Sequence, residues 1–87
     1  SFDERTLGLL RSLVALDAHG IQPRHIRNIR QTAEREVSLI ESAIAPLLRR
    51  TDAGSRAQAS EVAPELARRL EEIRQVFVGA ALERLTP

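Results

Sequence analysis

The strongest constraint on the fold is a helical apolar repeat that recurs along most of the chain. From Val37 to Leu47 the apolar residues are separated by steps that alternate between three and four, at Val37, Ile40, Ile44 and Leu47. This is the heptad spacing of a helix that packs lengthwise against another helix. A second series has steps of three or four and consists of Val62, Leu66, Leu70, Ile73, Phe77 and Ala81. No segment alternates as a strand does, so the predicted fold class is all-α.

Local signals place the first helix between Asp3 and Gly20. Asp3 can cap it by accepting from an unpaired backbone N–H, and Phe2 and Leu7 have the spacing of a hydrophobic staple. Two neighbouring apolar stripes follow, so we expect this helix to be covered on two sides. Gly20 suits the positive φ that often ends a helix, and Pro23 suits the first position of the next one.

The second helix meets a proline near its end. Pro46 is expected to kink it or end it near Ala45, although residues 47–50 could extend it by one turn. Residues 51–54, Thr-Asp-Ala-Gly, are predicted to form a loop.

The last helix is predicted to start at Ser55. Ser55 and Gln58 match a capping box, with serine at the cap and glutamine three residues later. Pro64 either kinks this helix or restarts it, and the helix is expected to run to about Leu85.

Together these elements predict a single helical domain over residues 1–87, with a short N-terminal helix and a long antiparallel helical hairpin. Apolar residues such as Leu39, Leu48, Val76 and Val78 lie around more than one face of the two long helices. Two helices cannot cover all of this surface, so we expect a second copy to complete a four-helix bundle. The alternative is a monomer in which the first helix supplies the cover. The heptad seam is the predicted core or dimer surface and comprises Val37, Ile40, Ile44, Leu47, Leu66, Leu70, Ile73 and Phe77.

Composition argues against several functions. The chain of 87 residues has no cysteine, a formal charge of +1 and only two aromatic residues. It lacks a stacking platform for single-stranded nucleic acid and an apolar run of about 20 residues that could span a membrane. His19 and His25 lack metal-ligand spacing, and no glycine-rich loop or nucleophile motif is present. We therefore predict no enzyme activity, metal or cofactor.

An arginine row is the best candidate for a ligand contact. Arg24, Arg27 and Arg30 recur every three residues at the start of the second helix, beside His25. Residues at this spacing share a face, and a helix N-terminus favours anions. The row could contact phosphates or an anionic effector, or it could be a solvated face partly paired with Glu34 and Asp17.

The first third of the chain resembles the later helices of MerR-type transcription regulators. The resemblance is carried by Phe2-Asp3-Glu4, by Leu7, Leu10 and Leu13, and by Gly20-Ile21, Pro23 and Ile26-Arg27. In that family a long helix follows and forms an antiparallel coiled coil between two subunits, an element that the seam from Val37 to Leu47 resembles. Residues 18–27 and the hairpin look most like the C-terminal domain of actinobacterial MerR-like regulators.

This resemblance implies a domain of a cytoplasmic bacterial regulator that dimerises and senses an effector or a partner, the effector being a small molecule or a peptide. The family reads DNA with a helix-turn-helix and wing that are absent here, and the chain begins with Ser1. We therefore expect a piece of a longer protein in which a missing N-terminal domain binds DNA. Two other interpretations remain, namely a helical module that binds another protein and a fragment that contacts DNA through Arg24, Arg27 and Arg30.

Overall fold

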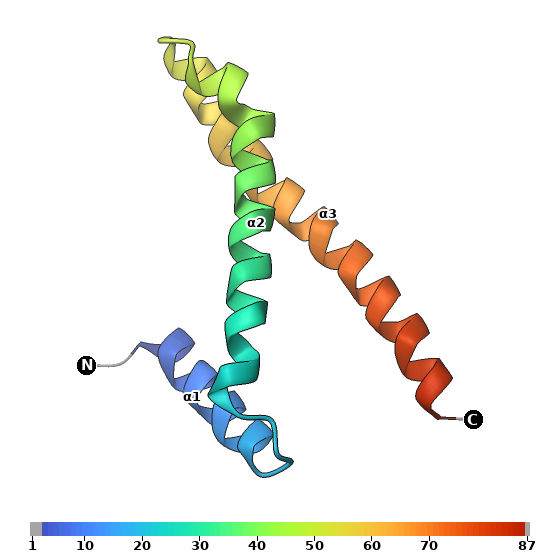
Figure 1. Ribbon diagram of the computed structural model, residues 1–87. Coiled ribbons are helices and arrows are strands. Elements are labelled where there is room, and N and C mark those ends of the chain that lie inside the picture. Colours follow the sequence, from blue (N-terminus) through green and yellow to red (C-terminus); the bar gives the residue numbers. More distant parts are fainter. Residues whose placement is uncertain (1–2, 87) are drawn as a thin grey trace. The chain divides into compact units, whose positions relative to one another are not determined.

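The computed structural model describes residues 3–86, which form three helices and, within that range, no strand (Figure 1). These are α1 (Glu4–Asp17), α2 (Pro23–Leu48) and α3 (Ala53–Leu85). The predicted all-α class is confirmed. The chain forms two compact units that divide within α2, one ending at Ala33 and the other beginning at Glu34.

Both ends of α1 form as predicted. Asp3 is the N-cap, and its Oδ1 accepts from the backbone N–H of Thr6 at 2.8 Å. This hydrogen bond lowers the pKa of Asp3. At the other end Gly20 has φ +84°, and the backbone N–H of Ile21 donates to the carbonyl of Leu16 at 3.0 Å. These are features of a Schellman motif, in which glycine takes the left-handed position at little cost. The proposed staple involves Phe2, which lies outside the described residues.

In the first unit, only some of the apolar surface of α1 is enclosed. Leu13 and Leu16 are half-buried, as is Ile26 at the start of α2. On the neighbouring stripe Leu10 is 42% exposed and Val14 is 73% exposed.

Helix α2 begins at Pro23 as predicted, and His25 stabilises this start. The backbone N–H of Gln22 donates to Nδ1 of His25 at 2.9 Å, and the backbone N–H of His25 donates to the carbonyl of Gln22 at 2.9 Å. His25 thus takes the place that glutamate or glutamine has in a capping box.

Pro46 does not end α2 near Ala45, because the helix continues to Leu48. A proline inside a helix removes its own hydrogen bond, here the one to the carbonyl of Ser42, and its ring crowds that carbonyl, but the bonds on either side can still form. The ladder resumes directly afterwards, since the backbone N–H of Arg49 donates to the carbonyl of Ala45 at 3.0 Å.

The predicted start of α3 is wrong by three residues at the cap. Asp52 is the N-cap and the helix begins at Ala53, so residues 53 and 54 belong to the helix and not to a loop. The carboxylate of Asp52 accepts from both the backbone N–H and the hydroxyl of Ser55, each at 2.9 Å. These hydrogen bonds lower the pKa of Asp52. Ser55 is therefore a donor to the cap, and its own burial (4% exposed) depends on that pairing.

Helix α3 passes Pro64 without a break and ends at Leu85, where the sequence placed its end. In the second unit it runs antiparallel to residues 34–48 of α2 (Figure 1). Ala59 is 3% exposed and is the only buried apolar residue among residues 3–86. A small side chain at this point lets the two helices approach closely.

Candidate interaction surface

The heptad seam divides into an inner part and an exposed part. The inner part is half-buried in the hairpin and consists of Ile40, Ile44, Leu47, Leu66 and Leu70. The exposed part is Val37 (53%), Ile73 (53%) and Phe77 (70%). Five of the eight residues thus contribute to packing within one copy, and three remain available to another molecule.

An ion pair lies where the inner part of the seam ends. Nη1 of Arg74 donates to the carboxylate of Glu36, with a distance of 2.6 Å to Oε2. This hydrogen bond raises the pKa of Arg74. In the sequence Glu36 interrupts the apolar pattern, and the structure gives the reason, because it meets a charged partner across the hairpin. The register implied by the two apolar series could have found this pair, since it sets Ile40 near Leu70 and Glu36 near Arg74.

Beyond this ion pair α3 continues through residues 75–85, which we call the arm. At 1.5 Å per residue the arm is about 16 Å long. Its large apolar residues are more than half exposed and are Val76, Phe77, Val78, Leu82 and Leu85. Its polar residues are Gln75, Glu83 and Arg84, so residues 76–82 between them consist of apolar residues and one glycine. A helix that is apolar over most of its circumference is normally enclosed by other helices.

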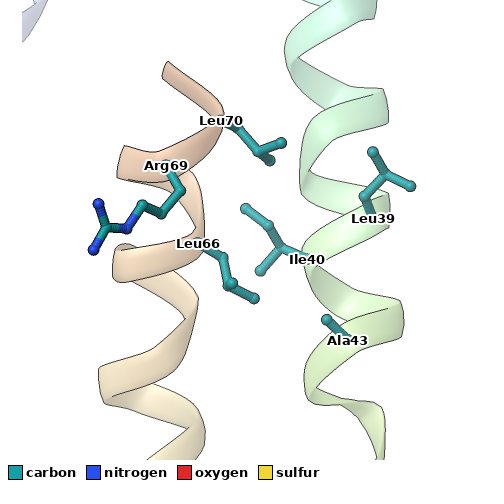
Figure 2. Close-up of a pocket in the computed structure, with 6 residues that line it drawn as sticks. All are labelled: Leu39, Ile40, Ala43, Leu66, Arg69 and Leu70. Carbon is teal, nitrogen blue, oxygen red and sulfur yellow. The ribbon is translucent and has the colours of Figure 1, made fainter. Parts of the chain in front are cut away.

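Between α2 and α3 lies an open apolar recess of about 190 Å³ (Figure 2). It is lined by Leu39, Ile40, Ala43, Leu66, Arg69 and Leu70. Leu66 and Leu70 point toward Ile40, whereas the guanidinium of Arg69 points away from the recess (Figure 2). That guanidinium lies within 3.8 Å of Glu65 and 3.4 Å of Glu72, so the recess offers apolar contact and no free charge.

The arginine row lies on the first turns of α2, in the first unit. Arg24, Arg27 and Arg30 are all exposed, and His25 is exposed but holds the helix cap. The structure brings these four residues together only through their spacing along one helix. Whether an anion or an effector binds them stays a prediction.

Residues 3–86 contain no group of three or more histidine, aspartate or glutamate side chains that could hold a metal ion. In the same range, no helix is both long enough and apolar enough to cross a membrane.

Comparison with known proteins gives a consistent result. The model of the Rv1828-like C-terminal domain matches residues 1–86. Two relatives are 38% identical over 66 residues, the uncharacterized HTH-type transcriptional regulators Rv1828 of Mycobacterium tuberculosis and Mb1859 of Mycobacterium bovis. The match covers 76% of this chain but only 27% of each relative. No solved structure gives a significant match.

Proposed function

Because the chain belongs to the Rv1828-like C-terminal domain family, we propose that it dimerises a DNA-binding transcriptional regulator of the MerR-like type. The relatives are named HTH-type transcriptional regulators, and this chain corresponds to about a quarter of their length. The proposal assigns DNA reading to another part of the parent protein and assembly to this domain. The proposal also implies that the parent protein acts in the bacterial cytoplasm, where DNA is found.

The observation that carries this proposal is the apolar surface that the second unit leaves exposed. Val37, Ile73 and Phe77 continue the heptad seam and are 53%, 53% and 70% exposed. The large apolar residues of the arm are also more than half exposed. Apolar helix faces of this kind are normally covered by other helices, and a second copy of the chain offers the same seam.

A two-fold dimer also fits the needs of a regulator that binds DNA. Dimeric helix-turn-helix proteins match their own symmetry to a palindromic operator, and the dimer interface fixes the spacing of the two reading heads. A ligand that prefers one dimer geometry would shift the equilibrium between geometries and hence the binding to DNA. This is the route by which the domain would sense an effector, whose chemical class the side chains do not select.

The proposal can be tested by fusing the chain to a DNA-binding domain that recognises its operator only as a dimer. Operator binding by the fusion is expected, and Phe77→Asp should abolish it because a carboxylate would be buried in the interface. Gln75→Asp is the matched control, since Gln75 is two residues from Phe77 and hence on the opposite side of the same turn. A fusion that leaves the operator unbound, together with a chain that sediments as a monomer at micromolar concentration, would refute dimerisation.

Direct contact with DNA predicts a different result. If the arginine row binds phosphates, the 87-residue chain alone should shift a DNA fragment, and this shift should weaken steeply with salt. The formal charge of +1 gives no reason to expect it. Specific DNA binding by the isolated chain would overturn the assignment of DNA reading to a separate domain.

A further inference from the structure

Each of the three helices within residues 3–86 begins at a hydrogen bond that a side chain accepts, and the one at α2 has a different chemistry. Asp3 and Asp52 cap α1 and α3 with carboxylates, and these hydrogen bonds lower the pKa of both groups. Both carboxylates therefore stay ionised, and their caps stay intact, above about pH 4. At α2 the acceptor is an imidazole nitrogen, Nδ1 of His25. Histidine is the side chain that ordinarily takes up a proton between about pH 5 and 8.

The hydrogen bond at the start of α2 requires a neutral imidazole ring. A ring nitrogen accepts through its lone pair, whereas both nitrogens of an imidazolium ion carry a proton and can only donate. The backbone N–H of Gln22, now 2.9 Å from Nδ1, would then meet a second donor in place of an acceptor. Glutamine, a usual residue at this position of a capping box, keeps its acceptor oxygen at every pH.

The charges around His25 oppose its protonation. Arg24 and Arg27 are its charged neighbours on the first two turns of α2, and the N-terminus of a helix is itself partly positive. The loop before α2 adds His19, and only Asp17 lies in the last turn of α1, whose charged residues are Glu4, Arg5, Arg11 and Asp17. Among residues 3–86, no ion pair involves His25. A proton on His25 would thus add positive charge beside two arginines without a paired carboxylate.

The cap of α2 also holds the loop that joins it to α1. In this loop the backbone N–H of Ile21 donates to the carbonyl of Leu16, and the next N–H, that of Gln22, donates to His25. The first hydrogen bond joins two backbone groups and does not depend on pH. Protonation would remove only the second one, so the loop would keep its attachment to α1 and lose its side-chain attachment to α2.

We propose that His25 makes the start of α2 sensitive to pH, so that its protonation opens the cap and frays the first turn of the helix. The cap contributes its full stability above the titration range of histidine, and this stability is lost as the pH falls through that range. Arg24 lies in the turn that frays, so acid would loosen its position relative to Arg27. This inference concerns the first unit alone and does not depend on the proposed dimerisation.

Nuclear magnetic resonance of the 87-residue chain tests the proposal without any substitution. Between about pH 7.5 and about pH 5.5, the amide signal of Gln22 should shift with the same midpoint as the ring signals of His25. Loss of a cap of ordinary strength should lower the protection of the Gln22 amide against hydrogen exchange by about fivefold. A Gln22 amide that keeps its shift and its protection while His25 titrates would overturn the proposal.

Three variants assign the response to one residue. His25→Gln keeps an acceptor that does not titrate, so the Gln22 amide should lose its pH response and keep its protection in acid. His19→Gln is the matched control, because it removes the other histidine of the chain and should leave the response unchanged. Asp17→Asn should likewise leave it unchanged. A response that survives His25→Gln, or that disappears with either of the other two variants, would refute the role of His25.

Discussion

Replacing Ala59 with leucine should separate α2 from α3 and destabilise the hairpin. Ala59 is 3% exposed, so a larger side chain has no room without movement of a helix. Overpacking of this kind typically costs about 1–3 kcal/mol. A loss of about 2 kcal/mol lowers the Tm of a domain this size by roughly 8–16 °C. Thermal unfolding followed by far-ultraviolet circular dichroism, at one fixed protein concentration, measures this shift.

Ala57 supplies the matched control. It is exposed and two residues from Ala59, hence on the opposite side of α3. Leucine and alanine differ little in helix propensity, so Ala57→Leu should leave Tm nearly unchanged. Glycine variants extend the comparison, because both lose about 1 kcal/mol of propensity and only Ala59→Gly loses a further ~0.8 kcal/mol for a buried methyl group. Equal Tm values for the two leucine variants would show that α2 and α3 are not closely packed at this point.

Five further substitutions test the backbone and the caps. Gly20→Ala should destabilise the chain by about 1–2 kcal/mol because of its φ of +84°, whereas Gly8→Ala should stabilise α1 by about 1 kcal/mol, since a Cβ there meets no atom within 4 Å. Urea unfolding compares the two, and a Gly20 variant as stable as the wild type would contradict the strain. Pro64→Ala should stabilise α3 by up to about 3 kcal/mol, and Pro23→Ala should do almost nothing, since only Pro64 lies inside its helix; equal shifts in the same assay would refute this difference. Because the cap hydrogen bonds lower the pKa of Asp52, its stabilisation is complete above about pH 4 and is lost as the pH falls through the lower folded value. Asp52→Asn should flatten this acid dependence in a pH titration of unfolding, and an unchanged profile would rule the cap out as its source.

Sequence alone predicts those helix ends that depend on one residue and its immediate neighbours. Asp3 caps α1, Gly20 takes positive φ after it, and Pro23 opens α2, all as expected. Each of these residues acts through its own backbone geometry or a hydrogen bond three residues away. Such signals need no knowledge of the tertiary structure.

The start of α3 was mispredicted because two caps compete within four residues. Both Asp52 and Ser55 are good N-cap residues, and either could accept from the free backbone N–H groups of a helix that begins just after it. The structure selects Asp52, which engages Ser55 itself through two hydrogen bonds. The spacing of three between Asp52 and Ser55 is the signal in the sequence that indicates Asp52 as the cap, because an N-cap side chain accepts from the backbone N–H three residues later.

The heptad spacing also does not show whether a residue of the seam packs within one copy or against another molecule. Ile40 and Phe77 have the same heptad spacing, yet Ile40 is half-buried within the hairpin and Phe77 is 70% exposed. The distinction depends on the register of α3 against residues 34–48 of α2, and the ion pair between Glu36 and Arg74 lies near the end of the half-buried part of the seam. The candidate surface therefore required the structure, although every residue in it was visible in the pattern.

The Glu36–Arg74 ion pair lies at the point from which residues 75–85 of α3 extend, so a change in this pair would change the direction of that segment. Residues 75–85 extend about 16 Å past it, so tilting them by about 5° would displace the end of α3 by roughly 1.4 Å. A small change in the geometry of this ion pair would thus produce a larger displacement at the end of α3. The pair of Glu36 and Arg74 is therefore the place where a small change in structure would move the end of α3 the most.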